Sequence, residues 1–247
     1  MTIETDQDLN GLKRIGRIVA LTVREMQRQL KPGITTADLN DIGARFLEQH
    51  GARPAPGLTY DFPAATCISV NNEAAHGIPG ERVIRSGDLV NIDVSAELDG
   101  YFADTGASMP VPPISALKRK LCNCARMARQ KAIGAARAGR RLNEIGQAIE
   151  TSARRCGFTV IRNVPGHGVG RGLHEEPSVP GFYLPSADQR LTEGLVITVE
   201  PFLATGARQV VTADDGWTLK TEDGSLAAQY EHTIVITRGR PIIITAL

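Results

Sequence analysis

The sequence lacks an excess of charge of either sign. Its 247 residues include 28 Lys and Arg against 27 Asp and Glu, so the formal net charge is +1. A protein that binds nucleic acid or an anionic membrane surface usually carries a basic patch, and this composition shows no such electrostatic footprint. We therefore expect no specific nucleic-acid partner and no membrane partner.

Long apolar runs and paired cysteines are also missing. No run reaches the roughly 18 apolar residues that a membrane span needs. The opening letters MTIETDQD have neither the basic nor the apolar region of a secretory signal. No Cys-x-x-Cys spacing occurs among the four cysteines, which are Cys67, Cys122, Cys124 and Cys156. We interpret all four as reduced thiols and expect a cytoplasmic protein.

Common catalytic and nucleotide-binding motifs are absent as well. There is no His-Glu-x-x-His and no Gly-x-Ser-x-Gly motif. The glycine-dense stretch GHGVGRG at 166–172 matches neither Gly-x-Gly-x-x-Gly nor the P-loop pattern. Its glycines are better explained by a backbone that passes close to a metal or substrate.

What the sequence does contain is a helical pattern that occurs twice. Residues 7–31 have apolar side chains at helical spacing, and a second helix is predicted over 36–50 with Thr36 as its N-cap. Residues 114–137 and 142–155 repeat this order. Each pair is followed by glycine and then by apolar segments typical of strands.

A short internal match strengthens the idea of a repeat. The letters LNDIG at 39–43 correspond to LNEIG at 142–146. We therefore expect one domain over 1–247 built from two related halves, about 1–110 and 111–247. If the two halves are related by a pseudo-two-fold axis, their sheets fuse into one, helices cover one face, and a site forms where the halves meet.

Two aspartates lie within the stretch NIDVSAELDGYFAD at 91–104. The Asp-Gly pair at 99–100 predicts a two-residue hairpin turn. Ser95 would then lie opposite Asp104, with Asp93 on the same face and its backbone about 7–8 Å away on the diagonal. The two carboxylates either face solvent on a two-sided sheet or share a cation between them.

Three further segments favour the cation. Glu200 ends an apolar run, Glu231 opens a β-branched one, and His167 lies in the glycine-dense stretch. Taken singly, each is an exposed strand end or a hydrogen-bonded histidine. If they converge with the aspartates, four buried negative charges require neutralisation, which two divalent ions would supply. Oxygen-rich ligands with one imidazole suit Mn, Fe(II), Co or Zn, and two such ions would hold a bridging hydroxide as nucleophile.

Seven ordered motifs carry a family resemblance. They are HGIP from His76, NIDV from Asn91, ADTG from Ala103, GHGVG from Gly166, HEEP from His174, TVEP from Thr198 and QYEHT from Gln229. In these motifs the chain resembles the type I methionine aminopeptidases, from about residue 8 to its last residue. The resemblance implies the α+β pita-bread fold, with two pseudo-symmetric halves that share a curved antiparallel sheet and carry helices on its outer face.

The same resemblance implies roles for particular residues. The family's two metal ions would be held by five ligands, which are Asp93, Asp104, His167, Glu200 and Glu231. His174 would donate a hydrogen bond to the scissile carbonyl, His76 would contact the amide nitrogen, and Glu200 would accept and shuttle a proton. Apart from the resemblance, His76 would be interpreted as a turn residue before Ile78-Pro79.

The resemblance also implies a methionine pocket with Phe62, Cys67 and Trp217 among its walls, although the only Trp of the chain could equally be a core residue. The sequence departs from common family members at Thr59 and Leu173, where aromatics are frequent, and at Ala75, where a Cys is frequent. These three positions are expected near the mouth of the site, where they would affect specificity.

The expected function is metal-dependent removal of the initiator methionine from nascent chains whose second residue is small. Nascent N-termini are the expected partners, with transient ribosome contact and a monomeric state. Xaa-Pro peptidases of the same fold carry a sizeable extra N-terminal domain, which this chain is too short to contain. Non-catalytic relatives typically lack some ligands, and here the ligand set is complete.

Overall fold

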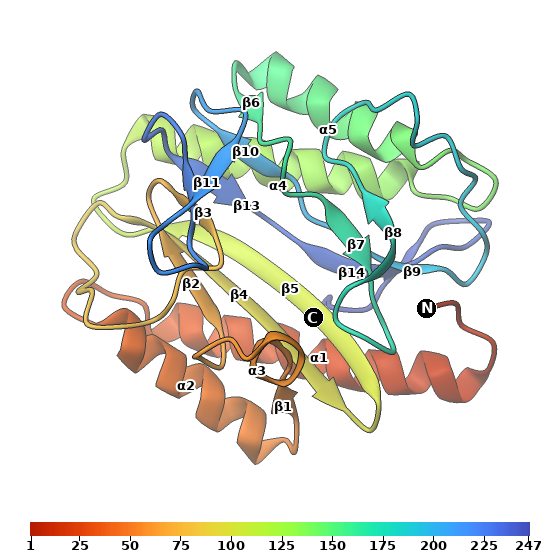
Figure 1. Ribbon diagram of the computed structural model, residues 1–247, viewed down its shortest axis with the longest axis horizontal. Helices are drawn as coiled ribbons and strands as arrows, with labels where there is room; N and C mark the ends of the chain where they lie inside the picture. Colours follow the sequence, from red (N-terminus) through yellow and green to blue (C-terminus); the bar gives the residue numbers. More distant parts are fainter.

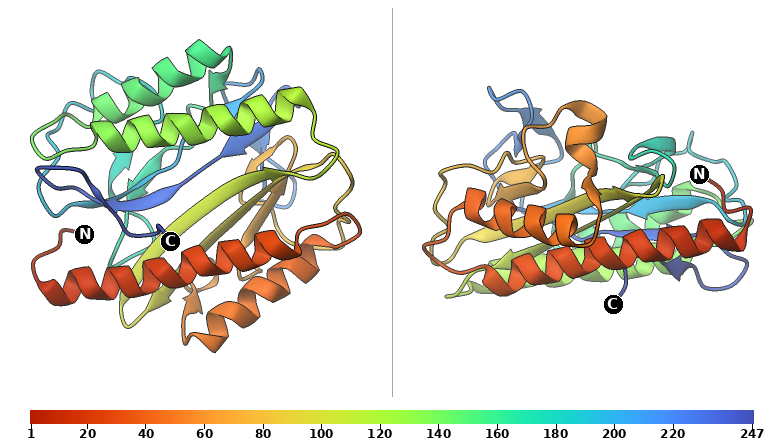
Figure 2. Two further views of the ribbon diagram at one scale, coloured as in Figure 1. Left: turned by 180° about the vertical axis from the view of Figure 1, so that it is seen from behind. Right: turned by 90° about the horizontal axis from the view of Figure 1, so that it is seen from below.

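The structure, a computed structural model, describes residues 1–247. A curved layer of strands carries the long helices on one side (Figures 1 and 2). The helices are α1 (Asp6–Gln29), α2 (Thr36–Gln49), α3 (Ala55–Tyr60), α4 (Ala116–Ala135) and α5 (Asn143–Cys156). No helix combines the length and the apolar character that crossing a membrane requires.

Fifteen strands follow the chain, most of them short. They are β1 (Arg53–Pro54), β2 (Cys67–Val70), β3 (Glu73–Ala75), β4 (Leu89–Leu98), β5 (Tyr101–Pro110), β6 (Thr159–Val160), β7 (Gly166–Gly168), β8 (Glu175–Val179), β9 (Val196–Val199), β10 (Phe202–Ala204), β11 (Val210–Thr212), β12 (Leu219–Thr221), β13 (Ala227–Gln229), β14 (His232–Val235) and β15 (Ile242–Ile243).

All four long helices predicted from the sequence are present, with small shifts at their ends. One boundary prediction was wrong, because Thr35 rather than Thr36 is the N-cap of α2. The Thr35 hydroxyl accepts a hydrogen bond from the Asp38 backbone N–H, and the Asp38 carboxylate accepts one from the Thr35 N–H. This reciprocal capping box satisfies two backbone donors at once, and Thr36 at the first helical position cannot make it.

The predicted hairpin joins β4 to β5. Ser95 pairs with Asp104 in the observed register, as predicted. Asp99 and Gly100 have φ values of +52° and +79°, the left-handed backbone that a two-residue turn of this twist requires. The turn therefore fixes which β5 residues share a face with the β4 aspartate.

The two faces of the β4–β5 ribbon differ sharply in character. Ile92 and Val94 on one face are fully buried in an apolar cluster with Leu12 and Ile15 of α1. The opposite face carries Asn91, Asp93 and Ser95 on β4, opposite Ser108, Gly106 and Asp104 on β5. Because side chains alternate along a strand, packing of the apolar face on α1 directs the polar one into the interior between the halves.

The sheets of the two halves meet along β5. The first half forms a sheet in the order β1-β4-β2 with β5 on β4, and the second contains the order β15-β14-β9-β7-β8. Across the junction the Glu231 N–H donates to the Gly106 carbonyl at 2.9 Å, and the Thr105 hydroxyl donates to the Glu231 carbonyl at 2.8 Å. A second apolar cluster lies beneath the other half, against α4 and α5. Asp104 and Glu231, two of the residues predicted as metal ligands, lie at this junction.

Candidate metal centre

The aspartates predicted as ligands lie at the centre of the polar face. Asp93 is paired in register with Gly106 on β5 and with Cys67 on β2. A Cβ on Gly106 would lie 2.5 Å from the Gln229 amide oxygen and 3.1 Å from Cγ of Asp93. Only glycine therefore leaves room for these side chains above β5.

His167 enters from the second half on β7. Its backbone N–H donates to the Thr198 hydroxyl at 2.9 Å, and its Nδ1 lies 2.8 Å from the Gly168 carbonyl oxygen. A carbonyl only accepts, so Nδ1 carries the proton and Nε2 presents a lone pair. Burial lowers the pKa of His167 to about 3, which keeps the ring neutral. Nε2 is therefore suited to bind a cation.

Two glutamates complete the cluster. Glu200 follows β9 and accepts a hydrogen bond from the Thr198 hydroxyl at 2.7 Å. Glu231 lies between β13 and β14, where its backbone is held against β5. The Nε2 atom of His167 lies 3.4 Å from a Glu200 oxygen and 3.9 Å from an Asp104 oxygen. His167, Glu200 and Asp104 thus lie close together, and Asp93 lines the same cavity as Asp104.

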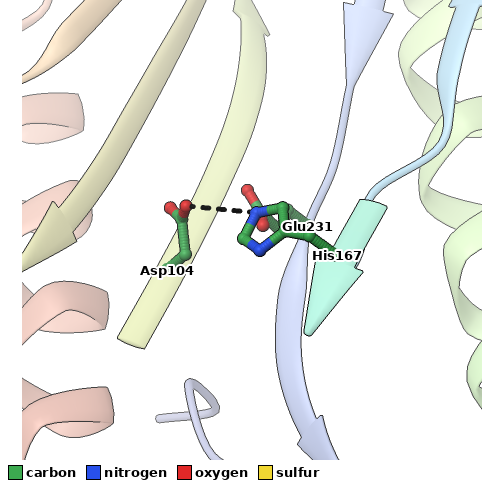
Figure 3. A group of neighbouring side chains, drawn as sticks. All are labelled: Asp104, His167 and Glu231. Atoms are coloured by element: carbon green, nitrogen blue, oxygen red, sulfur yellow. Dashed lines mark ion pairs between the residues drawn. The ribbon is translucent and has the colours of Figure 1, made fainter. Parts of the chain in front are cut away.

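Three of the five have their ligand atoms within 4.8 Å of one another (Figure 3), and these are Asp104, His167 and Glu231. Asp104 Oδ1 and Glu231 Oε1 are buried without any hydrogen-bond partner. Burial raises the pKa of Asp93 to about 6 and that of Glu200 to about 8. It also raises the pKa values of Asp104 and Glu231 well above their ordinary range, with neighbouring carboxylates adding to the effect.

These observations fit divalent cations. Unpartnered buried carboxylate oxygens with raised pKa values are costly in the ionised state, and a cation removes that cost. Carboxylate oxygens with a single imidazole match the preferences of Mn, Fe(II), Co or Zn. Binding of such cations would therefore explain why four carboxylates are buried together.

Two side-chain amides form a chain of hydrogen bonds that ends at the Glu231 carboxylate. The Asn91 amide donates to the Gln229 side-chain oxygen at 2.8 Å, and the Gln229 amide donates to Glu231 Oε2 at 2.9 Å. All three side chains are buried. Sequence reasoning missed Asn91 and Gln229 as functional residues, although both lie in quoted motifs, two positions before a predicted ligand. Their polar character within apolar strands was the available signal.

Two further histidines border the cluster. His76 follows β3 with a φ of +53°, and a Cβ on the next residue, Gly77, would lie 2.2 Å from the Ile68 carbonyl oxygen. His76 therefore has a left-handed backbone directly after β3, and its side chain lines the cavity beside the cluster. The ring of His174 lies 4.1 Å from that of His167, centroid to centroid. Burial lowers the pKa of His174 to about 4 and that of His76 below its ordinary value.

A cavity of about 250 Å³ opens beside the carboxylates. It is lined by Pro56, Tyr60, Phe62, Cys67, His76, Asp93, Ser95, Asp104, Leu173, His174 and Trp217. The rings of Phe62 and Trp217 meet edge to face, with centroids 5.2 Å apart. Burial, followed by the negative charge of Asp93, raises the pKa of Cys67, so its thiol stays neutral. The part of the wall that Phe62, Cys67 and Trp217 form is apolar and contains sulfur and aromatic rings.

Of the three departures from common family members, only Leu173 lines this cavity. Ala75 is buried in β3, and Thr59 is exposed. The aromatic side chain near Thr59 is its neighbour Tyr60, which lies at the cavity rim. Sequence reasoning missed Tyr60 because a position within a short helix has no periodic signal.

A family model, a sequence relative and a solved structure all relate the chain to metallopeptidases. The model of metallopeptidase family M24 matches residues 10–238. "Methionine aminopeptidase 2" of Bacillus subtilis is 51% identical over 249 residues, covering 100% of both chains. The crystal structure of methionine aminopeptidase from Thermotoga maritima superposes with a TM-score of 0.95 at 35% identity, again over 100% of both chains.

A more distant structure shares the fold alone. Prolidase from Pyrococcus furiosus superposes with a TM-score of 0.79 at 20% identity, and the chain covers 66% of it. The remaining third of that protein has no counterpart here. Taken with the full-length matches, the chain belongs to metallopeptidase family M24 and, within it, to the methionine aminopeptidases with the pita-bread fold.

Proposed function

We propose that the protein removes N-terminal methionine from polypeptides whose second residue is small, with two divalent cations held by Asp93, Asp104, His167, Glu200 and Glu231. The observation that carries this proposal is a cavity with Phe62, Cys67 and Trp217 in its wall directly beside the group of Asp104, His167 and Glu231. A thioether side chain suits a wall of Cys67, Phe62 and Trp217, because sulfur and aromatic rings attract one another.

When bound, the cations would polarise the scissile carbonyl and lower the pKa of water enough to make it a nucleophile at neutral pH. The protein side chains handle the substrate. His174 donates a hydrogen bond to the carbonyl oxygen as negative charge develops on it. His76 contacts the amide nitrogen of the scissile bond, and Glu200 takes up the proton of the attacking water and returns it to the leaving amine.

We further propose that the protein acts in the cytoplasm as a monomer, with nascent N-termini as its substrates and transient contact with the ribosome. Methionine is the first residue of each new chain, so access to that residue during synthesis would make removal efficient. Co-sedimentation with translating ribosomes tests the ribosome contact, and size-exclusion chromatography tests the monomeric state.

The deciding experiment uses metal-stripped protein to which Co or Mn is returned. We expect release of methionine from Met-Ala-Ser and little release of methionine from Met-Leu-Ser. We expect no release of the N-terminal alanine from an Ala-Pro peptide. Equal turnover of both methionine peptides would contradict the small-residue requirement. Cleavage of only the Ala-Pro peptide would support the activity of the more distant prolidases. Metal titration by calorimetry counts the sites, and a stoichiometry of one would contradict the dinuclear centre.

A further inference from the structure

Tyr60 makes a contact that the proposed mechanism does not yet use. It is the last residue of α3, and its phenol oxygen lies 2.5 Å from Nδ1 of His174. The two rings are 5.2 Å apart between centroids and inclined by 40°. The left-handed residue Asp61, with φ +57°, ends the helix and turns the chain between the rim at Tyr60 and the inner wall at Phe62.

The direction of this hydrogen bond decides the tautomer of the His174 ring. A neutral imidazole has one protonated nitrogen and one lone pair, and a phenol can either donate its proton or accept one. The phenol oxygen of Tyr60 has no other hydrogen-bond partner in the structure, so its proton has no other protein acceptor. When Tyr60 donates to Nδ1, the proton of the His174 ring must reside on Nε2.

We propose that Tyr60 is a positioning residue that holds His174 in the tautomer protonated at Nε2, so that this histidine meets the substrate as a hydrogen-bond donor. The catalytic consequence rests on the proposed function, in which His174 donates to the scissile carbonyl. The tautomer itself is a property of the protein that can be measured without turnover.

The neighbouring His167 shows why a fixed tautomer of His174 is useful. His167 and His174 are the same residue type with rings only 4.1 Å apart. The Gly168 carbonyl accepts from Nδ1 of His167 and so leaves Nε2 as a lone pair for a cation. Tyr60 has the opposite effect on His174. One partner at each Nδ1 thus makes one ring a ligand and the other a donor, and prevents His174 from competing as an additional ligand.

The direct test is nuclear magnetic resonance of the zinc-loaded protein with ¹⁵N-labelled histidine, because long-range ¹H–¹⁵N correlations distinguish the two tautomers. The His174 signals are identified by their loss in His174→Gln. We expect the pattern of a proton on Nε2 in the native protein and a shift toward a mixture in Tyr60→Phe. A proton on Nδ1 of His174 in the native protein would overturn the proposal without the need for any variant.

Kinetics provide the second readout. In Tyr60→Phe we expect kcat for Met-Ala-Ser to fall about three- to tenfold, the factor that one net hydrogen bond corresponds to, with KM and metal affinity little changed. Tyr183→Phe is the matched control, since Tyr183 is an exposed tyrosine (45%) outside the cavity. A Tyr60→Phe enzyme with unchanged kcat and an unchanged His174 spectrum would refute the positioning role.

The two proposals fail in different ways. If the native protein releases methionine while His174 carries its proton on Nδ1, the positioning role is wrong and the proposed function stands. If the tautomer is as proposed but no peptide is cleaved at its N-terminal methionine, the proposed function is wrong and the Tyr60 contact keeps only its effect on the ring.

Discussion

In this site, the hydrogen-bond partner of Nδ1 determines whether Nε2 of a histidine presents a lone pair or a proton. His167 and His174 come from one glycine-dense segment, yet the structure surrounds them differently. The ring of His167 is hydrogen-bonded to the Gly168 carbonyl on β7, and its backbone N–H to the Thr198 side chain on β9. The ring of His174 is instead hydrogen-bonded to Tyr60 in the other half. Sequence motifs identified both residues but could not indicate this difference, because the partner of His174 is 114 residues away.

Replacing His174 by Ala separates substrate handling from metal binding. We expect kcat to fall by about 10²–10³, the usual cost of losing one donor to a developing oxyanion. The dissociation constant for Mn, measured by calorimetry, should change by less than about threefold, since removing a group that is not a ligand leaves the cation's own contacts in place. Asp93→Ala and Glu200→Ala are the comparison variants, and both should lose metal and turnover together. Full activity of Asp93→Ala would refute the ligand set.

The amide chain behind Glu231 makes a separate prediction. Gln229→Leu keeps the approximate volume but removes the donor to Glu231 Oε2 and the nearest acceptor of the Asn91 amide. We expect Mn affinity to fall about 10- to 100-fold, the usual effect of losing a partner of a metal ligand. Gln209→Leu, at an exposed site, is the control. Equal metal affinity in the two variants, measured by calorimetry, would show that Glu231 does not need this support.

Secondary-structure elements place these side chains, and most of them were predictable. The helices and the β4–β5 hairpin follow from local signals: apolar periodicity, capping residues and the Asp-Gly turn. Among the short strands β6 to β15, only the apolar run before Glu200 and the β-branched run after Glu231 gave a strand signal, and these are β9 and β14. Most have two to four residues, too few for an alternating pattern, and their pairing depends on contacts between distant parts of the chain. Hence the predicted ligands on β4 and β5 could be placed in register, while convergence of Glu200 and Glu231 remained a hypothesis.

At Gly106 in β5, any side chain would collide with side chains of the site. In Gly106→Ala we expect the new methyl group to displace Gln229 or Asp93, because its ideal position is 2.5 Å from the Gln229 amide oxygen. Thermal unfolding should show a loss of about 1–3 kcal/mol, typical of overpacking, and Mn affinity should fall as well. Gly134→Ala in α4 is the control, since a Cβ there meets nothing within 4 Å and should stabilise the helix by about 0.5–1 kcal/mol. Native stability in Gly106→Ala would contradict this packing argument.

The whole molecule is organised around the junction of its two halves. Asp93 and Asp104 come from the first half and His167, Glu200 and Glu231 from the second, so a bound cation would join the halves. We propose that the halves arose by duplication, with the observed order of two long helices followed by strands in each as the support. Sequence could suggest this relationship only through the repeated order of helices and the five-letter match, because packing constrains the pattern of apolar residues far more than their identity.

Buried carboxylates at this junction make stability depend on pH in a direction opposite to that of ordinary acidic groups. In the metal-free protein the pKa of Asp93 is raised from 3.8 to about 6 and that of Glu200 from 4.5 to about 8. Between these values the folded state binds more protons than the unfolded state, so the free energy of unfolding falls as pH rises. We expect a loss of roughly 1 kcal/mol per group per pH unit across each group's own window, and therefore a lower Tm at pH 8 than at pH 5.

Cations should reverse this trend, because they stabilise the ionised carboxylates and bind only the folded arrangement. Scanning calorimetry with and without Mn is the measurement, and the increase in Tm on adding Mn should be larger at pH 8 than at pH 5. Asp93→Asn combined with Glu200→Gln removes two titrating groups, so this double variant should lose much of the pH dependence and most of the response to Mn. A metal-free Tm that is constant or rises between pH 5 and pH 8 would mean that the carboxylates are not held in a shared buried space between the halves.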